Sequence, residues 1–399
     1  MSERFRFNRL ELSGSLGDLG TLLPIAMALI LVNGLDPVGV FVSVGLFYVL
    51  SGLVFGVTVP VQPMKVIGAY AIATSVSSSQ ILASSLLMSL FLLLIGATGA
   101  IRLISRYTPK SVIRGVQLST GALLMAGGVR FMLGTSTYQT LQGAAEPALS
   151  LQYLGPLPIG VIIGAGAGLG TLLLLDNRKV PAGLAVILAG AILGILLGSP
   201  ESRVGLGPQL TLPEFMPLPF PGQVDFSYAL LALVLPQLPM TMGNAVLAYT
   251  DLSQEYFGDK SRRMTNTAAC LSMAVANAVS FVLGGMPMCH GAGGLAAHYR
   301  FGARTAGSNL MIGGLFIVLA LVFGPHLLTL LSLLPMSILG VLLVFAGAQL
   351  ALTILDLQER RDLFVAVLIL GITLASNLAA GFLVGIAVAS CLRWPRFSV

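Results

Sequence analysis

Pro60-Val61-Gln62-Pro63-Met64-Lys65 and Pro287-Met288-Cys289-His290-Gly291-Ala292-Gly293-Gly294 are the two stretches that decide the fold of this chain. Each begins with proline, carries polar groups and leads into small residues that suit a helix, although its surroundings are almost continuously apolar. At membrane depth such a break is tolerated only where it is buried in protein or lines a cavity, because lipid cannot satisfy the exposed backbone groups. Two breaks in corresponding positions of two halves indicate the substrate site of a transporter.

Composition places the chain in a membrane. Of its 399 residues 56% are hydrophobic and 9% are charged, whereas a soluble domain carries about 25% charged residues. The net charge of +6 does not indicate nucleic-acid binding, because the basic residues lie in short loops. No serine–histidine–acid set, metal-ligand cluster or phosphate-binding glycine loop is evident, so we expect neither an enzyme nor a metal or other cofactor. The three cysteines suggest no disulfide framework.

The apolar segments predict fourteen spans, of which the third and tenth are too short to cross alone and are interpreted as half-helices preceded by extended pieces. With the N-terminus inside, all Lys and Arg residues except Lys65, Arg130 and Arg203 fall in cytoplasmic segments or at their edges. This is a strong positive-inside pattern, and it predicts that both termini are cytoplasmic. The predicted spans are 13–33, 38–57, 62–78, 80–101, 111–131, 157–175, 181–198, 227–250, 265–284, 289–302, 306–330, 335–354, 361–375 and 376–392.

The two halves are predicted to form an inverted repeat, because seven spans reverse the orientation of the half that follows. Pro60 and Pro109 are 49 residues apart, and Pro287 and Pro335 are 48 apart. The predicted fold class is therefore an all-α polytopic membrane protein with 14 transmembrane segments in a 7+7 inverted repeat. The predicted divisions are a first repeat over 1–198, an external connector rich in proline and glycine over 199–226, and a second repeat over 227–399.

Polar residues at membrane depth gather in the two broken stretches and in the first span of each half, around Ser13–Thr21 and Pro236–Asn244. The N-terminus of each half-helix carries unpaired N–H groups that favour an anion. Lys65 is the one cation predicted to be buried in a spanning segment, and carboxylates are scarce near it. Side-chain donors accompany it, and this set indicates an anion site rather than a cation site: Thr21, Gln62, Thr241 and Asn244.

Each of these residues also has a purely structural interpretation. Lys65 could reach an interface or pair with Asp18, although a charge within the membrane usually has a functional or pairing reason. Asp18 could cap a helix or partner a cation. His290 is more easily explained as a satisfied packing residue than as a proton carrier, and Cys289 as a small core residue. The glycines of the first span are interpreted as helix-packing residues.

Four motifs resemble the molybdate transporter family, which is related to the sulfate permeases: Gly14–Thr21, Pro60–Lys65, Gln237–Ala245 and Met286–Gly294. The resemblance covers nearly the whole chain. It implies the seven-plus-seven fold shared with anion exchangers and nucleobase permeases, with a core domain (spans 1–4 and 8–11) that moves against a gate domain (spans 5–7 and 12–14). It also implies that the substrate lies between spans 1, 3, 8 and 10. As in that family, we expect no C-terminal regulatory domain of the sulfate-permease kind, and span 8 lacks the acidic residue of nucleobase permeases.

The sequence and the resemblance together predict a secondary transporter that imports molybdate, or tungstate, across the cytoplasmic membrane by alternating access. A sulfate or general oxyanion transporter and, less readily, an anion channel stay open as alternatives. Asp18 is the candidate for ion coupling, and family resemblance makes a homodimer plausible. The predicted substrate-binding residues are Thr21, Gln62, Met64, Lys65, Gln237, Thr241, Asn244, Cys289, His290, Gly291 and Ala292.

Overall fold

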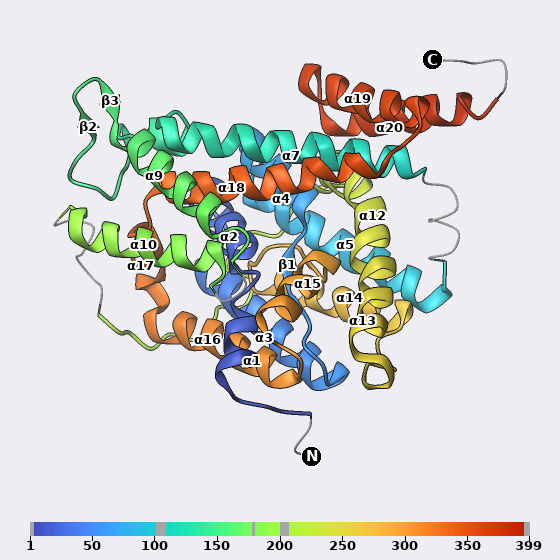
Figure 1. Ribbon diagram of the computed structural model, residues 1–399, viewed down its shortest axis with the longest axis horizontal. Helices are drawn as coiled ribbons and strands as arrows, with labels where there is room; N and C mark the ends of the chain where they lie inside the picture. The colour runs from blue at the N-terminus through green and yellow to red at the C-terminus, as the bar shows by residue number, and fades with distance from the viewer. Residues whose placement is uncertain (1–3, 101–108, 178–179, 200–206, 395–399) are drawn as a thin grey trace.

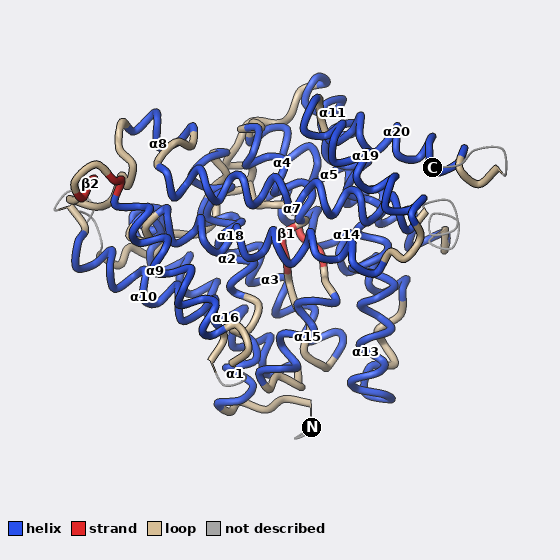
Figure 2. Tube along the Cα trace, turned by 45° about the horizontal axis from the view of Figure 1, so that its top comes forward, coloured by secondary structure: helices blue, strands red, loops and turns tan. Residues whose placement is uncertain are grey.

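The computed structural model describes residues 4–100, 109–177, 180–199 and 207–394 (Figure 1). In this part of the chain the structure is mainly helical, and its strands, each two residues long, form two separate pairs (Figure 2). The first half contains α1 (Arg9–Ser15), α2 (Leu19–Asn33), α3 (Pro37–Phe55), β1 (Gln62–Pro63), α4 (Lys65–Thr74), α5 (Ser78–Thr98), α7 (Lys110–Leu133), α8 (Thr137–Gln142), β2 (Tyr153–Leu154), β3 (Leu157–Pro158), α9 (Ile159–Leu174) and α10 (Ala182–Leu197).

The second half begins with one long helical run that contains two π-helical stretches, and it continues through shorter helices. Its elements are α11 (Gln223–Tyr228), η2 (Ala229–Val234), α12 (Leu235–Met240), η3 (Thr241–Ala248), α13 (Tyr249–Phe257), η4 (Gly258–Ser261), α14 (Asn266–Val282), β4 (Met288–Cys289), α15 (Ala292–Phe301), α16 (Ala306–Phe323), η5 (Gly324–His326), α17 (Leu327–Ser332), α18 (Met336–Ala351), η6 (Leu352–Asp356), α19 (Arg360–Ala375) and α20 (Leu378–Cys391).

Six of the described helical segments are long and apolar enough to cross a membrane, and a seventh span results if α1 and α2 count as one. The predicted span 13–33 is not one straight helix, because α1 and α2 meet at 45°. Gly17 lies in the break, where a Cβ atom would lie 2.8 Å from the Phe301 ring and 3.1 Å from the Ala297 carbonyl oxygen. The basic loop residues Arg102, Arg106, Arg178, Lys179, Arg203 and Arg396 lie outside the described residues.

The two proline-broken stretches meet at the centre of the molecule. β1 pairs with β4 in antiparallel register, with Gln62 opposite Cys289 and Pro63 opposite Met288. Each strand leads into a helix of ten residues, α4 or α15. The sequence predicts this order of an extended piece and a half-helix, and the pairing of the two strands satisfies part of the backbone that would otherwise be unpaired at membrane depth.

Two buried asparagines satisfy more of this broken backbone. Asn309 of α16 accepts a hydrogen bond from Val59 N at 2.8 Å and donates to Val59 O at 2.8 Å. Asn277 of α14 accepts from Met288 N at 2.9 Å and donates to Met288 O at 2.8 Å. Each extended piece is therefore fixed by an amide from a neighbouring helix, because an amide side chain can both donate and accept.

Two buried glutamates cap helices that are distant in sequence. Glu11 accepts from the backbone N–H groups of Arg304 and Thr305, just before α16. Glu146 accepts from Met336 N at 2.8 Å and from Ser337 N at 2.9 Å, at the start of α18. A carboxylate at a helix N-terminus satisfies donors that have no partner inside the helix. Both contacts join the first half of the chain to the second.

Helix pairs from the two halves pack against each other. α3 packs on α16, α5 packs on α14, and α7 runs alongside α18 (Figures 1 and 2). The α7–α18 crossing is close because glycines face backbone on both sides: a Cβ atom at Gly347 would lie 2.5 Å from Gly121 O, and one at Gly340 would lie 2.5 Å from Gly128 O. Small residues permit such backbone contact within membranes.

Candidate functional site

A cavity lies beside the two half-helices. The larger of its two lobes has a volume of about 340 Å³, and the smaller about 170 Å³. The two lobes share five lining residues, Thr21, Lys65, Gly293, Ala346 and Gln349, so we treat them together as the central cavity. Four helices line both lobes: α2, α4 and α15 on one side and α18 on the other. In addition, α9 and α10 line the larger lobe, and α7 and α12 line the smaller one.

Five of the predicted site residues line this cavity. Asp18 and Gln62 line the larger lobe, Asn244 lines the smaller lobe, and Thr21 and Lys65 line both. They come from the break before α2, from α2 itself, from β1, from the first position of α4 and from η3. The structure thus brings together residues that lie up to 226 positions apart in the sequence.

Lys65 has no ion-pair or hydrogen-bond partner among the described residues. No direct ion pair joins it to Asp18, whose carboxylate accepts a hydrogen bond of 2.6 Å from Gln62 Nε2, although the two charges lie near enough to interact through space. Asp18 and Gln62 are both buried, with side chains at most 5% exposed. The cavity therefore contains an ammonium group that is not neutralised by direct contact, and this arrangement is chemically suited to an anion.

The N-termini of the two half-helices differ in what they offer. At α4, Gln237 Oε1 accepts from Val66 N at 3.0 Å and from Ile67 N at 3.3 Å, and Met64 N donates to Pro287 O. α15 has no side-chain cap at Gly291. Gly293 in its first turn lines both lobes, and a Cβ atom there would meet nothing within 4 Å. The uncapped helix N-terminus that opens into the cavity is that of α15.

Several predicted residues are engaged elsewhere. Gln237 donates through Nε2 to Thr241 Oγ1 at 2.9 Å, and both side chains are buried behind α4. Cys289 Sγ lies 3.8 Å from Pro63 O within the strand pair. Neither Thr241 nor Cys289 lines the cavity, and neither do Met64, Gln237, Gly291 or Ala292.

His290 is a fully buried core residue. Its ring hydrogen-bonds Ser272 Oγ at 2.9 Å and Pro60 O at 3.1 Å, and it stacks on Tyr249. This is the satisfied packing position that the sequence favoured, and it lies outside the central cavity. No group of three or more His, Cys, Asp or Glu side chains that could hold a metal occurs among the described residues.

The cavity is also lined by polar residues that the sequence analysis did not single out. Gln117 of α7 and Thr353 of η6 line the smaller lobe, and Gln349 of α18 lines both lobes. Arg300, near the end of α15, lines the larger lobe. The sequence signal for the two amides is their position within predicted spans, Gln117 in 111–131 and Gln349 in 335–354, but neither lies in a broken segment.

Comparison with known proteins identifies relatives along nearly the whole chain. A family model described as "Molybdate transporter of MFS superfamily" matches residues 10–124 and 229–350. Molybdate transporter 2 of Arabidopsis thaliana is 32% identical over 413 residues, which cover 96% of this chain and 87% of the relative. Molybdate transporter 1 of Chlamydomonas reinhardtii is 31% identical, with 97% of this chain and 94% of the relative covered.

Solved structures share the fold. The transmembrane domain of the cyanobacterial bicarbonate transporter BicA superposes with a TM-score of 0.66 at 17% identity, covering 96% of this chain and 97% of that one. Murine Slc26a9, an anion transporter in its inward-facing state, gives a TM-score of 0.66 at 15% identity, covering 98% and 69%. The fold is thus shared with multi-pass membrane transporters. The family model and the relatives, which are transporters and not enzymes, confirm the resemblance seen in the four motifs: the chain belongs to the molybdate transporter family.

Proposed function

We propose that this protein is a secondary transporter that imports molybdate across the cytoplasmic membrane by alternating access. The oxyanion is held in the central cavity between the half-helices α4 and α15. The observation that carries the proposal is Lys65, an ammonium group without a direct partner among the described residues, in the same cavity as the uncapped N-terminus of α15. Both features favour a bound anion.

The substrate contacts follow from the groups that line the cavity. Lys65 supplies charge, Asn244 supplies a side-chain donor, and the backbone N–H groups in the first turn of α15 supply the rest, whereas the Thr21 hydroxyl, which the sequence predicted as a donor to the substrate, hydrogen-bonds Asp18. Gln62 lines the larger lobe while its amide nitrogen is occupied by Asp18. Gln237 acts through α4, since it holds the N–H groups of Val66 and Ile67 and thereby fixes the helix that carries Lys65.

The proposed architecture is the seven-plus-seven inverted repeat with core and gate domains. Support comes from reciprocal packing between the halves: α3 of the first half packs on α16 of the second, and α5 of the first half packs on α14 of the second. The pairing of β1 with β4 joins the halves in the same reciprocal way. The larger lobe extends to Arg300 at the end of α15 and to Leu175 and Pro181 between α9 and α10. With both termini cytoplasmic these residues lie on the cytoplasmic side, so the conformation is inward-facing.

The test is a binding isotherm with molybdate on detergent-purified full-length protein, repeated in a large excess of sulfate, together with uptake into proteoliposomes. We expect saturable binding that survives sulfate and accumulation against a gradient. Binding that sulfate abolishes at comparable concentration would favour the general oxyanion transporter. Ohmic anion currents without accumulation would favour the channel, and the absence of oxyanion binding would refute the proposed site.

Asp18 is the proposed coupling residue, because it is a buried carboxylate at the cavity with Lys65 and Arg300 as the other charged lining residues. Asp18→Asn keeps an oxygen that can accept from Gln62 but cannot carry a charge or exchange a proton. In proteoliposomes with an imposed proton gradient, the variant is expected to lose gradient-driven accumulation and to keep exchange of labelled for unlabelled molybdate. Full gradient stimulation in the variant would exclude Asp18 as the coupling group.

A further inference from the structure

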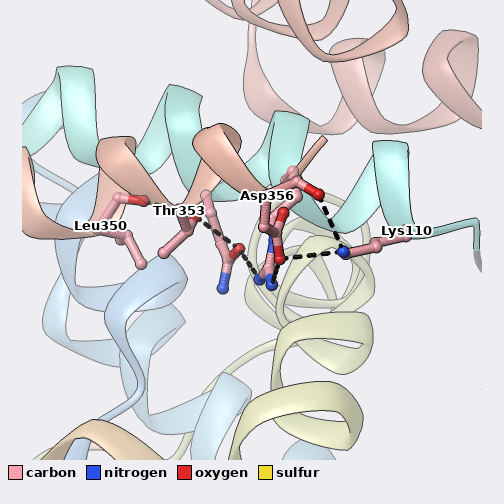
Figure 3. A network of polar contacts seen from close by, with 6 residues as sticks. Lys110, Leu350, Thr353 and Asp356 are labelled. Atoms are coloured by element: carbon pink, nitrogen blue, oxygen red, sulfur yellow. Dashed lines mark hydrogen bonds and ion pairs between the residues drawn. The ribbon is translucent and has the colours of Figure 1, made fainter. Parts of the chain in front are cut away.

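A polar cluster joins α7 to η6 beside the central cavity (Figure 3). Asp356 accepts from Arg114 Nε at 2.9 Å and also from Arg114 Nη2, and it pairs with Lys110 Nζ at 3.1 Å. Arg114 is thereby held by two contacts to one carboxylate, the bidentate geometry that fixes a guanidinium group most firmly. Its remaining terminal nitrogen, Nη1, donates to Gln117 Oε1 at 2.7 Å.

This contact decides the orientation of the Gln117 amide. A guanidinium group only donates hydrogen bonds, so the group that faces Arg114 must be the amide oxygen and not the nitrogen. The Thr353 hydroxyl lies 3.0 Å from the same oxygen. The amide nitrogen is therefore turned away from Arg114. It has no acceptor within hydrogen-bond distance among the described residues, although the side chain is only 3% exposed.

Gln117 lines the smaller lobe of the central cavity together with Lys65 and Asn244. The amide nitrogen has no protein acceptor in the described part of the chain and is accessible from the cavity, so it is available to donate to a molecule bound there. The bond from Arg114 to its oxygen polarises the amide and strengthens its N–H groups as donors. An oxyanion between Lys65 and Gln117 would supply the missing acceptor.

We propose that Gln117 is a substrate-contacting residue that donates to the oxyanion from the α7 wall, and that the Arg114–Asp356 pair is its positioning device. This inference rests on the proposed function, and it adds a contact from the helices opposite the two half-helices. An anion held from both walls bridges α4 and α15 to α7, so binding would link the two sets of helices that move relative to each other during transport.

The experiment compares molybdate isotherms of the purified full-length parent with those of Gln117→Glu and Gln117→Met. Glutamate keeps the oxygen for Arg114 but turns a negative charge toward the dianion, so we expect affinity to fall by about a hundredfold or more. Methionine keeps the bulk and removes the donor, so we expect a fall of roughly tenfold. The matched control is Gln80→Glu, which makes the same charge change in the capping box at the start of α5 and should bind like the parent.

The positioning role is tested by a double-mutant cycle. Arg114→Met is expected to weaken binding several-fold in the parent and to have no further effect when Gln117 is already methionine. An equal loss in both backgrounds would overturn the positioning role. Parent-like affinity of both Gln117 variants would overturn the contact, whereas a parent that binds neither molybdate, tungstate nor sulfate would refute the proposed function instead. Thermal unfolding identifies a misfolded variant, and if Gln117→Glu does not fold, Gln117→Met decides.

Discussion

Replacing Lys65 by methionine is expected to weaken molybdate binding by roughly ten- to a hundredfold, because a hydrogen bond to a charged group is worth about 1.5–3 kcal/mol and each 1.4 kcal/mol is a tenfold change. The methionine retains most of the apolar stem, so the substitution removes the charge with little change in packing. Since Lys65 has no direct partner among the described residues, its loss leaves no buried acceptor unsatisfied. The expected defect is therefore in affinity and not in folding.

Two further variants make the Lys65 result specific. Lys65→Arg keeps the charge and should retain part of the affinity, although its larger planar group is not equivalent to an ammonium. Arg262→Met removes a positive charge from an exposed ion pair with Asp259 and should bind like the parent, because surface charges are screened. Isotherms and thermal unfolding are measured on all four proteins. Binding by Lys65→Met within about twofold of the parent would remove Lys65 from the site.

The sequence predicted the centre of the fold well because its signals there are strong. Proline and polar residues interrupt two apolar stretches, and few structures accommodate such a break within a membrane. The two stretches pair as β1 and β4, and each is followed by a ten-residue helix. The bend between α1 and α2 was not predicted, because Gly17 is compatible with a continuous span and its close approach to Phe301 is a tertiary contact.

The site was predicted only in part, because an amide at membrane depth can serve a ligand or a helix. Gln237 and Asn244 occur in one motif, yet Gln237 caps α4 whereas Asn244 lines the cavity. Nothing in the local sequence distinguishes these uses, since each depends on which element packs opposite. Gln117 was missed for the same reason: its significance comes from Arg114 and from the distant η6, which carries Asp356.

The glycine contacts between α7 and α18 lead to the largest expected effect on stability. Gly347→Val places branched methyl groups where even a Cβ atom would lie 2.5 Å from Gly121 O. Backbone on the facing helix cannot rotate aside as a side chain can, so the two helices must separate. Because overpacking a tight contact costs about 1–3 kcal/mol and sometimes more, we expect a loss of about 3 kcal/mol or more, seen as a large drop in the thermal unfolding temperature in detergent.

Gly166→Val is the matched control, because Gly166 lies within α9 and a Cβ atom there would meet nothing within 4 Å. It makes the same substitution in a helix of the same chain, and its unfolding temperature should stay close to that of the parent. A small effect at both positions would show that α7 and α18 are not closely packed in the membrane.

The crossing also carries Gln117 and Gln349 on its two helices. A milder Gly347→Ala variant that folds is therefore expected to lose molybdate affinity as well, because separating the helices displaces both amides from the cavity wall.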